Sequence, residues 1–124
     1  MDTGLIIKAG VYDCGMARVR LGDVAIFSRQ LATMQAAGLP LVQAVAIIAE
    51  QTENSVFKAI LARVAGDIQA GAGFPDALAK HPYVFPALFV NMVKAGIRGG
   101  NLDVILERIS SHFEKEIIFN LNPA

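Results

Sequence analysis

The sequence lacks several features that would point to a class of protein. Its 124 residues include one cysteine, Cys14, which excludes an intrachain disulfide framework and fits a reducing compartment. Cys14 has no histidine or electropositive setting near it, so we expect no role for it as a nucleophile. Eleven basic residues balance eleven acidic ones, and no basic run occurs. This balance gives no electrostatic reason to expect a nucleic-acid partner or an anionic lipid surface.

A long continuous hydrophobic run is also missing. The longest stretch without charge, residues 30–49, contains three glutamines and is interrupted by Gly38 and Pro40. Its apolar residues are periodic, which is typical of buried helices rather than of a membrane span. Asp2 stands where a signal peptide would carry positive charge. We therefore expect a soluble chain with neither a transmembrane segment nor an export signal.

Sets of catalytic or metal-binding residues are absent as well. The only histidines are His81, interpreted as a loop residue, and His112, placed at the edge of the core. They share no ligand spacing with Cys14, and the glycine clusters fit neither a dinucleotide fingerprint nor a phosphate loop. Glu107 and Glu114 are interpreted as a solvated helix face. We predict no catalytic residues, metal, cofactor or small-molecule substrate.

Apolar residues are plentiful, at 54% of the chain. We therefore expect a folded domain rather than disorder, and the surplus of apolar surface predicts contact with a partner chain or with a membrane-proximal neighbour. We expect a homodimer or a higher oligomer.

The stretch from Phe27 to Val45 has the pattern of the end of one helix, a turn and the start of a second helix. Val24, Phe27 and Leu31 share one face, Gly38 and Pro40 stop one helix and start the next, and the following apolar residues form a second stripe. Two stripes joined by so short a turn must fold back and bury each other, which predicts a helical hairpin.

The same pattern continues to the end of the chain. It predicts helices over 23–37, 40–51, 56–68, 74–80, 86–94 and 101–120, with 95–100 as a turn and Asn101 as a cap. No stretch alternates enough to predict a sheet, although 5–7 is compatible with a short strand. The predicted fold is an all-α, six-helix bundle built from successive antiparallel hairpins. We assign 21–120 to the helical domain and 1–20 to a leader, a linker or a non-native remnant.

The residues also resemble the type II secretion system F protein family, which includes inner-membrane platform proteins of type IV pilus assembly. The resemblance spans about three quarters of the chain, from Leu21 to Lys115. It is carried, in order, by Phe27, Arg29–Thr33, Ala37–Leu41, Ala49–Asn54, Gly73, Ala77, Leu78, His81, Pro82, Val84–Pro86, Met92, Val93, Ala95, Gly96 and Gly100–Asp103.

The resemblance implies a function. It implies a non-enzymatic scaffold domain, the first of two such domains, on the cytoplasmic face of the inner membrane in a larger membrane protein. The scaffold would link the cytoplasmic assembly ATPase to other inner-membrane platform proteins. A helical adaptor unrelated to secretion is one alternative, and a small enzyme with its site across a dimer interface is another.

Four residues are predicted to contact partners, from their expected exposure and turn positions: Arg29, Gln30, Arg98 and Asn101. The chain departs from the family pattern after Ala95-Gly96, where Ile97 replaces an acidic residue. For this reason also we predict no metal site.

Overall fold

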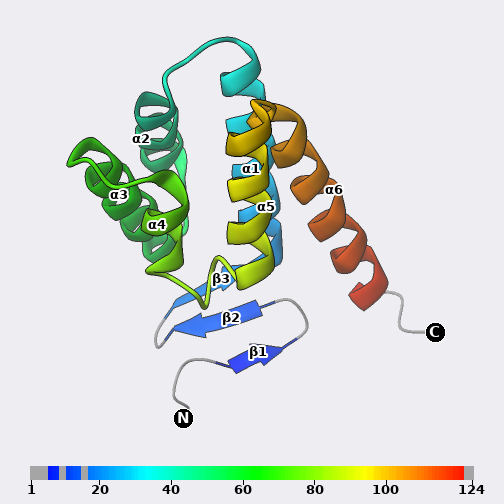
Figure 1. The fold of residues 1–124 in the computed structure, drawn as a ribbon. Coiled ribbons are helices and arrows are strands. Elements are labelled where there is room, and N and C mark those ends of the chain that lie inside the picture. Colours follow the sequence, from blue (N-terminus) through cyan, green and yellow to red (C-terminus); the bar gives the residue numbers. More distant parts are fainter. Residues whose placement is uncertain (1–5, 9–10, 15–16, 122–124) are drawn as a thin grey trace.

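The computed structural model describes residues 6–8, 11–14 and 17–121. Three short strands precede six helices (Figure 1). The strands are β1 (Ile6–Lys8), β2 (Val11–Cys14) and β3 (Ala17–Arg20). The helices are α1 (Leu21–Ala36), α2 (Leu41–Gln51), α3 (Ser55–Gln69), α4 (Phe74–Ala79), α5 (Ala87–Gly99) and α6 (Leu102–Leu121). The predicted six-helix, all-α bundle is confirmed for the part of the chain that begins at Leu21. Among the described residues, none of the helices combines the length and the apolar character that a membrane span requires.

The strands form an antiparallel sheet of order β1-β2-β3, which the sequence analysis did not predict. Tyr12 pairs with Ile7 on one side and with Val19 on the other. Strands of three or four residues are too short to show a clear alternation, so their pairing became visible only in three dimensions. The suggested strand at 5–7 is found at Ile6–Lys8, and residue 5 lies outside the described residues. The division of the chain at residue 20 stays a prediction.

Five phenylalanines connect the helices through the core. Phe27 of α1 lies 5.9 Å from both Phe57 of α3 and Phe85, which precedes α5. Phe85 lies 5.0 Å from Phe89, whose ring stacks on Phe113 of α6 at 6.2 Å, all distances being between ring centroids. Burial of such large side chains supplies much of the stabilising apolar area. This aromatic row therefore joins the beginning of the bundle to its last helix.

The helices are arranged with α1 and α5 in the middle, α2, α3 and α4 on one side and α6 on the other (Figure 1). The first and last helices, α1 and α6, share the most extensive helix contact, while α2 with α3 and α5 with α6 form the main sequential hairpins. The predicted hairpin of α1 and α2 is present, with Gly38 in the left-handed conformation (φ 91°) between the two helices. The α6–α1 contact thus closes the bundle.

The expected turn at 95–100 is wrong, because α5 continues to Gly99 and only Gly100 adopts the left-handed conformation (φ 71°). Gly96 is a buried helical residue. A Cβ on Gly96 would lie 3.1 Å from Cβ of Ile105 and 3.1 Å from Cα of Leu102. Glycine is therefore present here because α6 approaches α5 closely, rather than because the helix ends.

Candidate interaction surfaces

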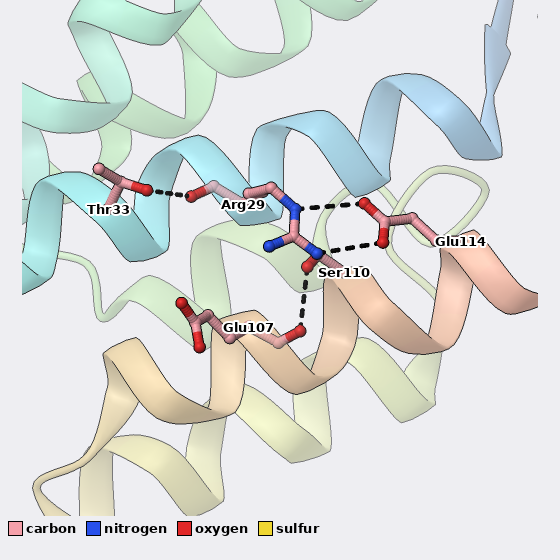
Figure 2. Close-up of polar contacts among 5 residues, drawn as sticks. All are labelled: Arg29, Thr33, Glu107, Ser110 and Glu114. Atoms are coloured by element: carbon pink, nitrogen blue, oxygen red, sulfur yellow. Dashed lines mark hydrogen bonds and ion pairs between the residues drawn. The ribbon is translucent and has the colours of Figure 1, made fainter.

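Arg29 on α1 lies against α6 and is bound there. Its Nε donates to Oε2 of Glu114 at 3.2 Å and its Nη2 donates to Oε1 at 3.0 Å, as Figure 2 shows. Both side chains are about half exposed, at 47% and 46%. The bidentate geometry suits the planar guanidinium group. The pKa of Arg29 is raised, mainly by the hydrogen bond to Glu114 and secondly by the negative charge of that carboxylate. Arg29 is thus engaged within the chain, and its predicted partner contact remains a prediction.

Glu114 lies on a solvated face of α6 as interpreted, with its side chain 46% exposed, but it also forms an ion pair that the sequence analysis did not predict. Its carboxylate joins α6 to α1 across 85 positions of sequence, whereas Glu107 is exposed and uses its backbone carbonyl to accept a hydrogen bond from Ser110 (Figure 2). The charges were visible in the sequence, but their pairing depended on how α1 packs against α6.

Gln30, the next residue along α1, lies beside a different surface. It lines a pocket of about 210 Å³ between residues 23–30 of α1 and the joint of α2 and α3, residues 52–54, and we call this pocket the joint pocket. The joint holds Asn54, whose Oδ1 accepts a hydrogen bond from the backbone N–H of Phe57, so Asn54 is the N-cap of α3. The hydroxyl of Thr52 donates to the carbonyl of Ile48 at 2.7 Å. These bonds define the shape of the joint.

Core side chains form the floor of the joint pocket and polar ones form its rim. Phe27, Ile48 and Phe57 on the floor are at most 2% exposed. Asp23 and Glu53 stand on the rim, contributed by α1 and by the joint respectively. An apolar floor with a few polar groups around it is typical of a binding pocket. The sequence analysis missed this site, although Ile26, outside the apolar stripe of α1, was a signal for it.

Arg98 and Asn101 lie at the other end of α1. Both are exposed, Arg98 in the last turn of α5 and Asn101 between α5 and α6. The backbone N–H of Asn101 donates to the carbonyl of Gly96 at 3.0 Å, which fixes the course of the chain between the two helices. A shallow hollow of about 380 Å³ lies beside this turn, between it and the last residues of α1. Ile97 is 47% exposed here, at the position where the family resemblance implies an acidic residue.

The four predicted contact residues therefore fall in three places. Arg29 faces α6, Gln30 borders the joint pocket, and only Arg98 and Asn101 share one surface. Residues adjacent on a helix point in different directions, which separates Arg29 from Gln30.

The histidines lie apart from these surfaces. His81 is half-buried in the loop between α4 and α5, as interpreted, and its buried Nε2 has no hydrogen-bond partner among the described residues. The pKa of His81 is lowered, mainly by burial and secondly by the positive charge of Arg63. His112 was expected at the edge of the core but is exposed on α6, 3.5 Å from the carboxylate of Glu116. In the described part of the chain no three metal-binding side chains gather.

Comparison with known proteins assigns the family. Residues 27–121 match the model of the type II secretion system protein F family. The chain is 54% identical over 97 residues to the type IV pilus assembly protein PilC of Thermus thermophilus, covering 78% of this chain and 24% of that protein. It is 45% identical over 101 residues to PilC of Myxococcus xanthus, covering 82% and 24%.

A secretion protein is also similar. Identity to the type II secretion system protein F of Vibrio cholerae is 38% over 92 residues, covering 74% of this chain and 23% of that protein. The chain thus spans about a quarter of the length of these relatives. With a family match across five of its helices and part of α1, the chain belongs to the type II secretion system protein F family.

Proposed function

We propose that this chain is a non-enzymatic scaffold domain of an inner-membrane platform protein in type IV pilus assembly or type II secretion. The family match over residues 27–121 carries the proposal, together with relatives named for these two machines. A scaffold needs rigid surfaces rather than reacting groups, and the phenylalanine row supplies a rigid core. On this proposal the domain lies on the cytoplasmic face of the membrane and assembles as a homodimer or a higher oligomer.

The partners on this proposal are the cytoplasmic assembly ATPase and the other inner-membrane platform proteins. We assign the ATPase contact to the end of the bundle that carries Arg98 and Asn101. Both side chains are exposed there, and Ile97 beside them offers apolar area. An exposed cation with a neighbouring apolar side chain suits a protein interface, where arginine is enriched. The alternative, an adaptor unrelated to secretion, has no comparable support from the comparisons.

The test is binding of the purified domain to the hexameric assembly ATPase of the same organism, with and without nucleotide. We expect saturable binding, and we expect Arg98→Glu to weaken it, because the charge reversal replaces an attraction between this side chain and the ATPase by a repulsion. Arg63→Glu, the same change at an exposed site on α3, serves as the control and should leave binding unchanged. Absence of binding in every nucleotide state, or equal losses in both variants, would refute the assigned contact.

A further inference from the structure

We infer that the joint pocket receives an arginine side chain of a partner protein. This inference deepens the proposed scaffold role by assigning a second contact, at residues 23–30 of α1, whereas the surface that carries Arg98 and Asn101 adjoins the last residues of that helix. Its test uses no component of the machine. Failure of one proposal is therefore distinguishable from failure of the other.

The floor of the pocket suits the stem of a long side chain. Phe27, Ile48 and Phe57 belong to the buried core, and Phe27 and Phe57 are themselves in edge contact at 5.9 Å. Such a floor is preformed, so little reorganisation is needed on binding. The three-carbon stem of arginine packs on apolar surface while its charged end reaches polar groups at the rim.

The rim suits a cation. Asp23 and Glu53 place two negative charges in the lining of the pocket, and none of the lining residues that the structure describes is basic. One oxygen of Asp23 accepts a hydrogen bond from the backbone N–H of Arg20 at 2.9 Å, while Glu53 forms no ion pair with any described residue. A guanidinium group, with five donors in a plane, can bind carboxylates from two directions. Gln30 adds an amide oxygen as a further acceptor on the same rim.

An apolar side chain at the mouth indicates a protein partner rather than a free cation. Ile26 lines the same pocket and is 58% exposed, more than any other large hydrophobic side chain in the part of the chain that the structure describes. A free cation would leave it exposed, whereas a segment with an apolar residue next to its arginine would cover it. Arginine anchors surrounded by apolar contacts are a common centre of protein interfaces.

The experiment is a titration of the isotope-labelled chain, followed by amide chemical shifts, with Nα-acetyl-arginine methylamide. The citrulline analogue, which has the same shape without the charge, is the matched probe. We expect saturable shifts at residues 23–30 and 51–57, and binding of the citrulline probe about tenfold weaker, because charge-assisted hydrogen bonds are lost. No saturable shift, or equal binding of both probes, would overturn the inference.

Two variants sharpen the test. Glu53→Gln removes one of the two rim charges and should reduce the preference for arginine over citrulline, whereas Glu50→Gln removes an exposed charge near the pocket but outside its lining and should preserve the preference. Equal losses in the two variants would show a general charge effect and refute the assigned pocket.

The role of Ile26 has a separate readout. Acetyl-Arg-Leu-methylamide should bind more tightly than acetyl-Arg-Gly-methylamide, and Ile26→Ala should remove that difference. If leucine adds no affinity to the unaltered chain, a protein segment as the occupant is refuted.

Discussion

Alanine at Gly66 should stabilise the protein, whereas alanine at Gly96 should not. Both glycines are helical and each lies fourth from the last residue of its helix, in α5 and α3 respectively. A Cβ on Gly66 would meet no heavy atom within 4 Å outside its own helix, whereas one on Gly96 would lie 3.1 Å from Ile105 and from Cα of Leu102. The two substitutions therefore differ mainly in crowding.

The magnitude follows from two opposing effects. Alanine is about 0.8–1.0 kcal/mol better than glycine inside a helix, and this gain applies to both sites. Crowding at Gly96 opposes it by about 1–3 kcal/mol, since the Cα of Leu102 is backbone and cannot rotate away. We expect Gly66→Ala to raise the free energy of unfolding by up to about 1 kcal/mol, and Gly96→Ala to lie about 1–3 kcal/mol below it.

Urea unfolding followed by far-ultraviolet circular dichroism measures the difference, provided that the slope with denaturant stays the same in both variants. A Gly96→Ala protein as stable as the Gly66→Ala protein would refute the close approach of α5 and α6 as the reason for glycine at this position.

Three further predictions concern the core, the loop histidine and the ion pair. Phe85→Ala should lower the free energy of unfolding by about 3–5 kcal/mol, because a buried ring that contacts three other rings is lost. Leu88→Ala, at an exposed position, is the control and should change this free energy little. Equal losses of the two variants in urea unfolding would contradict the prediction. Burial lowers the pKa of His81 in the folded state. The contribution of the His81 side chain to stability is therefore complete above its unfolded-state pKa of about 6.5, and it is lost as the pH falls through the folded-state pKa. The urea midpoint should therefore fall less between pH 7.5 and pH 5 in His81→Gln than in the unaltered chain, and equal falls would refute the effect. In a double-mutant cycle of Arg29→Ala and Glu114→Ala, the coupling should be favourable in low salt and shrink in high salt, as screening requires; coupling that is independent of salt would contradict an electrostatic bond.

The helices themselves were predictable because their signals are local. Hydrogen bonds inside a helix join residues four apart, and apolar stripes repeat every three or four residues, so each helix is visible in its own stretch of sequence. Gly38 was correctly placed as a helix stop for the same reason. The glycines near Gly100 were misjudged, since glycine both ends helices and permits close packing, and sequence alone does not separate the two roles.

The candidate surfaces were only partly predictable. Gln30, Arg98 and Asn101 were singled out and do lie at the pocket rim or in exposed positions, while Glu53 and Ile26 were missed. The rim and mouth of the joint pocket come from segments more than twenty residues apart, so no spacing within one helix reveals them.

By itself, the sequence determined the order of the helices, the hairpin of α1 and α2, and the family through its ordered motifs. The tertiary structure alone decided that the first and last helices are joined by Arg29 and Glu114, and that α6 packs closely against α5 at Gly96. It also decided that three short strands pair ahead of α1. The physical reason is the range of the interactions. Helix formation depends on neighbours along the chain, whereas ion pairs, close helix approaches and strand pairing depend on which distant segments packing brings together.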